Sequence, residues 1–188
     1  VQRGAIYLDY ISKTKMVIIS HPTGNANVRA AVAGLADADI LSEFHTAIAS
    51  FPGSTLDRLG GIGPLSEIRR RGFEARLQPF TKTWPWFELG RLVAAKAGLK
   101  SLVRHEKGMF SVDAVYHNMD RRLTSRLNKV ARKVNAVYGY EDGAMFTFRE
   151  ATRLGLKCLY DLPIGYWRTS RHLLGIERER WPEWKNTL

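Results

Sequence analysis

Residues 134–168 read VNAVYGYEDGAMFTFREATRLGLKCLYDLPIGYWR, and the pattern of this stretch decides the fold class. Its apolar and aromatic opening, residues 134–140, is typical of a short strand buried on both faces. Apolar residues then recur at helical spacing from 144 to 154, and Gly155 stands where a helix commonly ends. A second short apolar run, 158–160, follows. The stretch therefore predicts a strand, a helix and a second, parallel strand joined by a right-handed crossover.

The polar residues that follow these two strands are the first candidates for a functional site. In a parallel sheet flanked by helices, ligands bind beyond the carboxyl ends of the strands. Glu141 has a second interpretation, in which its carboxylate caps the helix that starts near Gly143. Asp161 and Arg168 either support the site or simply pair with each other. The residues expected at this edge of the sheet are Tyr140, Glu141, Asp142, Gly143, Asp161 and Arg168.

A second candidate loop follows an earlier strand, which is predicted at residues 16–20. The loop reads HPTGNAN, in which Gly24 favours a turn and Asn25 or Asn27 is a suitable cap for the next helix. A helix start preceded by glycine presents backbone amides that suit a phosphate or a sugar hydroxyl. The loop is neither a dinucleotide-binding glycine fingerprint nor a Walker A loop. A structural turn and a ligand contact both remain open for these residues.

Four segments together resemble a known family: ISHPTGNANVRAA at 19–31, VYGYEDGA at 137–144, GLKCLYDLPIGYWR at 155–168 and PEW at 182–184. They are similar to the N-terminal domain of bacterial glycosyltransferases that have two Rossmann-like domains, the GT-B fold. The resemblance is to the large retaining group that includes sucrose and glycogen synthases, often called glycosyltransferase family 4 or group 1. It implies an α/β fold for residues 16–188, with a Rossmann-like parallel sheet flanked by helices.

The resemblance also implies an activity. Enzymes of this family transfer a hexose from a nucleotide diphosphate sugar to an acceptor hydroxyl, with retention at the anomeric carbon and generally without a bound metal or cofactor. The second, donor-binding domain is expected to be missing from these residues, so the chain is expected to be inactive alone. Glu141 is then the candidate for orienting the acceptor hydroxyl, while Gly24 and Asn25 would contact donor phosphate or acceptor.

Other classes remain as alternatives. The chain could be a non-catalytic Rossmann-like domain that binds a partner or an anion. A dinucleotide-dependent oxidoreductase is disfavoured because the glycine pattern after the first strand does not match its fingerprint. Nucleic acid is not an expected partner, since no zinc finger, KH loop or RNP motif is present.

Composition and charge limit these classes further. The chain has 188 residues, enough for one sizeable core, with 29 Lys and Arg against 18 Asp and Glu and a formal net charge of +11. Such a surplus attracts anions such as nucleic acid, lipid headgroups and nucleotide diphosphates, and charge alone does not make the chain a nucleic-acid binder. The single cysteine, Cys158, permits no internal disulfide and is expected to be a small buried strand residue. We expect a cytoplasmic protein, with neither a membrane-spanning run nor a leader.

The remaining segments carry further expectations. Residues 1–15 are predicted to be an extension outside the core, or else to add an edge strand. The arginines of 67–72 are predicted to form a solvated face, or else to meet lipid headgroups or a substrate phosphate. His45 is predicted to be a structural residue in a second strand. A helix opening at 83–87 is expected to bury Leu89, Leu92 and Val93. The long helix at 111–130 has a basic face that either is solvated or lies on an anionic membrane. Trp181, Pro182 and Trp184 are expected to pack the tail on the domain.

Overall fold

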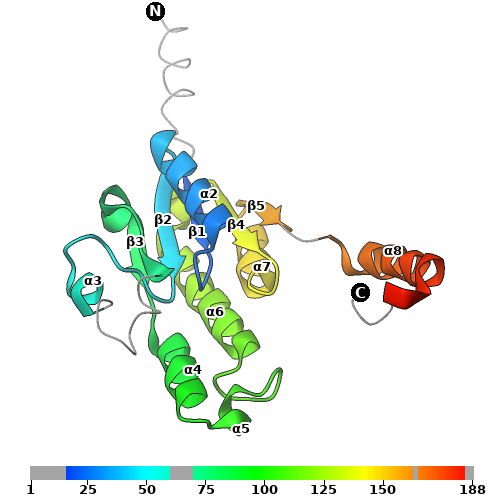
Figure 1. Cartoon of the computed structure of the whole chain (residues 1–188). Coiled ribbons are helices and arrows are strands. Elements are labelled where there is room, and N and C mark those ends of the chain that lie inside the picture. Colours follow the sequence, from blue (N-terminus) through cyan, green and yellow to red (C-terminus); the bar gives the residue numbers. More distant parts are fainter. Residues whose placement is uncertain (1–15, 60–69, 163–164, 185–188) are drawn as a thin grey trace, which may run out of the picture.

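Five strands form one parallel sheet in the order β3-β2-β1-β4-β5 (Figure 1). The computed structural model describes residues 16–59, 70–162 and 165–184, so the predictions for 1–15 and for 67–69 lie outside the described residues. The first described strand, β1, lies in the middle of the sheet; the chain then builds outward to β3 and crosses back to β4. This reversal is typical of a Rossmann-like fold, and it confirms the fold class predicted from the sequence. The strands are β1 (Val17–Ser20), β2 (Leu41–Thr46), β3 (Thr81–Thr83), β4 (Ala136–Tyr140) and β5 (Lys157–Asp161).

Helices cover both faces of the sheet. On one face α2 (Ala26–Asp37) and the 3-10 helix η2 (Ala75–Phe80) pack over Ile19 and its neighbours. On the other face α6 (Val112–Val130) and α7 (Met145–Arg153) pack over Ile18. Successive residues of a strand point to opposite faces of the sheet. Because helices cover both faces, β1 is buried at all four positions. This explains why the first strand is a continuous apolar run rather than an alternating one.

The structure describes six further helices. They are α3 (Thr55–Leu59), α4 (Trp86–Lys96), α5 (Lys100–Val103), η3 (Ala131–Lys133), α8 (Trp167–Arg180) and η4 (Pro182–Trp184). In Figure 1, α4 and α5 lie below the sheet, on the side to which β2 points. None of the described helices is both long enough and apolar enough to cross a membrane.

The edge strand β5 is paired as predicted but is more exposed to solvent than predicted. It pairs with β4 in parallel, as predicted. However, four of its five residues are exposed, and Cys158 is among them. The prediction that Cys158 is a small buried side chain is wrong. A strand with only one neighbour and partial helix cover keeps much of its surface in solvent.

Helices α4 and α8 also bury fewer of their apolar side chains than the sequence pattern predicted. In α4 the buried residues are Glu88 and Ala94, whereas Leu89 and Val93 are exposed, which contradicts the predicted buried stripe. In α8 no residue is buried, and Figure 1 shows this helix set apart from the sheet. Trp181, Pro182 and Trp184 are all exposed, so the prediction that they pack the tail on the domain is wrong. Helical periodicity identifies an apolar face but does not say whether another element covers it.

Candidate functional site

The candidate site lies where β1 and β4 end side by side. Ser20 of β1 stands opposite Gly139 of β4, so the loops after these strands are neighbours. This is the point at which the strand order reverses, where open α/β sheets bind ligands. His21 follows β1, and its ring meets the ring of Tyr140 edge-on with 5.0 Å between centroids. Tyr116 of α6 approaches the same imidazole at 5.7 Å.

The imidazole of His21 has a defined protonation state. Its Nδ1 atom accepts hydrogen bonds from the backbone amides of Thr23 at 3.1 Å and Gly24 at 3.0 Å. Burial first, and then the positive charge of Arg71, lower the pKa of His21 to about 4. The ring is therefore neutral near pH 7 and carries its proton on Nε2. It is 5% exposed and can act as a hydrogen-bond donor, not as a cation.

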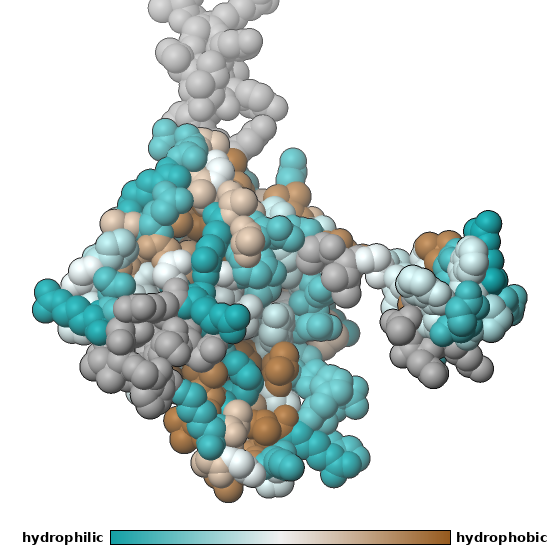
Figure 2. Space-filling view, in the orientation of Figure 1, coloured by the Kyte–Doolittle hydropathy of each residue, from teal (hydrophilic) through white to brown (hydrophobic). Residues whose placement is uncertain are grey.

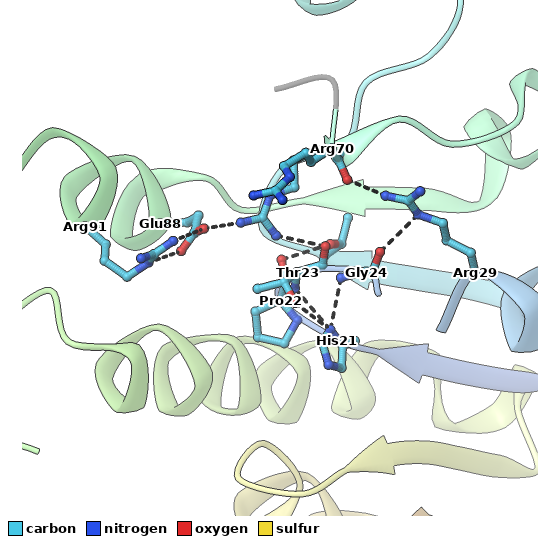
Figure 3. A network of polar contacts seen from close by, with 10 residues as sticks. His21, Pro22, Thr23, Gly24, Arg29, Arg70, Glu88 and Arg91 are labelled. Atoms are coloured by element: carbon cyan, nitrogen blue, oxygen red, sulfur yellow. Dashed lines mark hydrogen bonds and ion pairs between the residues drawn. The ribbon is translucent and has the colours of Figure 1, made fainter. Parts of the chain in front are cut away.

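Two arginines hold the loop between β1 and α2 from the outside (Figure 3). Arg71 donates to the carbonyl oxygen of Thr23 at 2.8 Å, and Arg29 donates to that of Gly24 at 3.0 Å. Arg71 also pairs with Glu88 at 2.5 Å, and Arg91 pairs with the same carboxylate at 2.8 Å. The side chain of Arg71 is only 12% exposed. The prediction of a solvated face is therefore wrong for Arg71, which helps to hold the loop between β1 and α2 in place.

The loop between β1 and α2, which contains Gly24, is a structural turn, and some of its backbone N–H groups already donate hydrogen bonds within the protein. Gly24 has φ of +61°, and a Cβ there would stand 2.4 Å from the ring of Phe73. Asn25 is the N-cap of α2, and its Oδ1 accepts from the amide of Val28 at 2.9 Å. Asn27 is exposed in the first turn of α2. Because the amides of Thr23 and Gly24 serve His21, a ligand would meet the next amides along the helix start.

The acidic loop after β4 faces the same edge. Gly143 closes a tight turn on Tyr140, with 3.4 Å from its amide to the carbonyl oxygen, and Asp142 adopts a positive φ of 63°. Burial first, and then the charges of Glu141 and Asp142, raise the pKa of Tyr160. No hydrogen bond or ion pair joins the Glu141 carboxylate to another residue in the described part of the chain. That carboxylate is half-buried and available to a ligand.

The helix-capping interpretation of Glu141 is wrong. The amides of Phe146 and Thr147, in the first turn of α7, donate to the carboxylate of Asp120 at 2.8 Å each. Asp120 comes from the middle of α6 and is 1% exposed. A carboxylate from a distant helix thus satisfies the helix start, and Glu141 is left for another role.

Two tyrosines of β4 extend the site towards β5. The hydroxyl of Tyr138 donates to Asp161 at 2.7 Å. The hydroxyl of Tyr140 is buried and has no hydrogen-bond partner among the described residues. Burial is the largest cause that raises the pKa of Tyr140 far above its ordinary value. Both phenols are therefore neutral donors near pH 7.

Arg168 is not brought to this edge. It lies in α8, where its guanidinium stands 5.2 Å from the ring centroid of Trp167. Asp161 bonds to Tyr138 instead of Arg168. The predicted support of the site by Arg168, and its predicted pairing with Asp161, are both contradicted.

The structure adds residues that the sequence did not indicate. His21 could have been found, since it is the first polar residue after a buried strand. Tyr138 could have been found from its position two residues before Tyr140, because alternate residues of a strand share a face. Tyr116, Arg71 and Glu88 come from distant segments and carry no local signal.

Neither a metal-binding cluster nor a similar protein points to further residues of the candidate site. Within the described ranges, no group of three or more His, Cys, Asp or Glu side chains is placed to hold a metal ion. No family model, curated protein or solved structure matches the chain.

Proposed function

We propose that this chain is the acceptor-side, Rossmann-like half of a retaining glycosyltransferase of the GT-B fold. One observation carries the proposal furthest. The segments 19–31 and 137–144, which both bear the family resemblance, are far apart in the sequence but contain the adjoining loops after β1 and β4. In those loops His21 and Tyr140 are in ring contact. A resemblance that recurs in two neighbouring loops at one edge is expected when that edge is a common binding site.

The proposed reaction transfers a hexose from a nucleotide diphosphate sugar to an acceptor hydroxyl. Glu141 accepts a hydrogen bond from that hydroxyl and orients it. His21 donates from Nε2 to a neighbouring sugar hydroxyl. The start of α2, shaped by Gly24 and capped by Asn25, attracts the negative groups of the donor through its positive end.

The remaining candidates have supporting roles. Asp142 and Gly143 set the turn that presents Glu141, and Asp161 orients the hydroxyl of Tyr138. Asn27 offers its amide and side chain at the exposed first turn of α2. The proposal requires neither a cofactor nor a metal, and the donor-binding domain supplies the groups that hold the leaving nucleotide diphosphate.

Titration of the chain with a panel of neutral glycans and nucleotide sugars, followed by NMR, tests the proposal. Wild type is expected to bind a glycan weakly, at about millimolar Kd, with shifts at the loops after β1 and β4. Glu141→Gln is expected to weaken binding about fivefold or more. Glu150→Gln is the matched control, because Glu150 pairs with Arg153 on α7.

Two outcomes would contradict the proposal. One is a chain that binds no glycan or nucleotide sugar at all. The other is binding that is equally strong in Glu141→Gln. Either result would favour the alternative, a non-catalytic Rossmann-like domain that binds a partner or an anion.

A peripheral membrane contact belongs to the same proposal, but α4 supports it better than α6. In α6, Arg126 pairs with Glu43 and Arg122 stacks over Trp84, so the basic face is partly engaged within the protein. In α4, Trp86 is 62% exposed and Val93 is 65% exposed. Figure 2 shows hydrophobic residues gathered beside hydrophilic ones at the α4 and α5 end of the molecule. An exposed tryptophan beside an exposed apolar side chain suits the interfacial region of a bilayer.

Vesicle sedimentation tests this contact. Trp86→Ser with Val93→Ser is expected to release the chain from phosphatidylglycerol vesicles. Leu159→Ser, on the exposed edge strand, is the control and should leave binding unchanged. Equal loss in both variants would remove α4 from the proposal.

A further inference from the structure

The sheet carries charged side chains on the face where β2 and β3 meet α6. Glu43 and His45 of β2 are both buried there, joined by 2.8 Å between the histidine Nε2 and a carboxylate oxygen. Arg126 of α6 donates from Nε to both oxygens of Glu43, at 3.2 and 3.0 Å. Burial opposes ionisation of Glu43, but the hydrogen bonds from His45 and Arg126 outweigh it and lower its pKa to about 2. The carboxylate is therefore ionised and fully used by these two partners.

Beside this cluster lies a hollow of about 430 Å³ between the edge strand β3 and α6. That volume is within the range of small-molecule sites, roughly 300–1,000 Å³. None of the described residues that line it is acidic. They are His45, Lys82, Thr83, Trp84, Met119, Arg122, Ser125, Arg126 and Lys129. None of them belongs to the loops after β1 and β4, so the hollow is separate from the candidate transferase site.

Three of the four cations in this hollow lack an acidic partner within the described part of the chain. Arg126 is neutralised by Glu43. Lys82 and Lys129 have no ion pair there, and Arg122 contacts the ring of Trp84 with 3.4 Å from its central carbon to the centroid. An aromatic ring attracts the guanidinium but does not neutralise it, so the positive charge of Arg122 remains available to an anion. Uncompensated positive charge in a concave site favours an anion.

The chemistry of the lining selects a phosphate group. Lysines act as point charges and arginine presents a planar fork, a combination that suits an anion with several oxygens. The hollow is larger than one phosphate needs, and Trp84 and Met119 supply apolar wall for an organic substituent. Ser125 adds a hydroxyl. We propose that this hollow binds an organic phosphate, with Lys82, Arg122 and Lys129 holding its oxygens.

The phosphate could be carried by a soluble molecule or by a lipid headgroup, and the probes separate these sources. Calorimetry and NMR use inorganic phosphate and glycerol 3-phosphate. Sedimentation uses phosphatidylcholine vesicles with and without phosphatidic acid. Binding is expected for at least one phosphate-bearing probe and to weaken with added salt. Glycerol alone should not bind.

The decisive variant replaces both lysines, Lys82→Gln with Lys129→Gln. Both are exposed, so the fold should be kept, and the variant is expected to weaken phosphate binding about tenfold or more. The matched control is Lys107→Gln with Lys157→Gln, which removes the same charge from exposed positions outside the hollow. Arg122→Lys keeps the charge but loses the planar fork, so an intermediate loss is expected.

Three results would overturn the proposal. The first is no binding of any phosphate-bearing probe. The second is equal weakening in the two double variants, which would mean attraction by net charge alone. The third is binding of inorganic phosphate or glycerol 3-phosphate that Lys82→Gln with Lys129→Gln leaves unchanged, or binding to phosphatidic acid vesicles that only Trp86→Ser with Val93→Ser abolishes. A wild-type chain that binds no glycan, or glycan binding that is unchanged in Glu141→Gln, would leave this proposal untouched, so the two proposals fail independently.

Discussion

Asp120 of α6 and Thr147 of α7 are joined by two hydrogen bonds. The amide of Thr147 donates to Oδ1 of Asp120 at 2.8 Å, and its hydroxyl donates to the carbonyl oxygen of Asp120 at 3.1 Å. The other carboxylate oxygen accepts from the amide of Phe146 at 2.8 Å. A buried carboxylate on one helix thus caps the start of the next. It fixes the position of the loop that carries Glu141.

Asp120→Ala is expected to lower the free energy of unfolding by about 2–3 kcal/mol, because two amides at a buried helix start lose their acceptor. Urea denaturation measures the change. The control is Asp113→Ala, whose carboxylate also accepts a backbone amide, from Glu106 at 2.9 Å, but at an exposed site. A loss of about 1 kcal/mol or less is expected there. Equal losses in the two variants would contradict the role of burial at Asp120.

His21 makes stability depend on pH. Its pKa is lowered from 6.5 to about 4 on folding, so the unfolded chain binds a proton that the folded chain does not. Stability from this group is present above about pH 6.5 and is lost as the pH falls towards 4, by about 3 kcal/mol in total. Glu43 acts at lower pH, since its pKa falls from 4.5 to about 2.

His21→Asn isolates this effect, because the asparagine Oδ1 can replace Nδ1 as the acceptor for the Thr23 and Gly24 amides. Denaturation between pH 7 and 4.5 should show a shallower loss of stability in the variant than in wild type. The same slope in both proteins would mean that the imidazole is not held neutral.

The loop glycine can be tested against two matched positions. Gly24→Ala combines a positive φ with a Cβ only 2.4 Å from Phe73, and should cost about 2 kcal/mol or more. Gly53→Ala has φ of +78° but open space, so it should cost about 1 kcal/mol. Gly34→Ala, inside α2 with open space, should stabilise by about 0.5–1 kcal/mol. Thermal unfolding gives the order, and a cost at Gly24 no larger than at Gly53 would contradict the Phe73 contact.

Glu88 is the buried carboxylate that pairs with the arginines beside the loop between β1 and α2. It is 1% exposed and pairs with both Arg71 and Arg91. Glu88→Ala is expected to cost about 3–5 kcal/mol, because it leaves the buried guanidinium of Arg71 without its carboxylate. Arg91→Ala leaves the pair of Arg71 and Glu88 intact and should cost less. Urea denaturation compares the two, and a greater loss in Arg91→Ala would contradict this order.

Much of the fold could be predicted from local pattern. The continuous apolar run of β1, the helical spacing of α6 and the strand-helix-strand pattern at 134–160 each require particular elements. Parallel pairing of β4 and β5 follows because a helix joins them. Gly24 and Gly155 do adopt positive φ values, as turn and helix-end residues should. These features depend on neighbours in sequence, so the sequence alone determines them.

The candidate site could be predicted from the sequence only in part. The sequence placed Tyr140 and Glu141 at a strand end and Asn25 at a helix cap, because those positions follow from local spacing. Only the folded chain shows that Asp120, from a separate helix, caps α7 and leaves Glu141 uncommitted.

What covers each face was also decided only by the fold. Leu89 and Val93 have the same apolar character as Leu123 and Leu127, but only the latter pair meets the sheet. Burial, pairing of distant charges and the protonation state of His21 all arise from contacts between segments far apart in the chain. A local pattern holds no information on such contacts, because they depend on how whole elements pack.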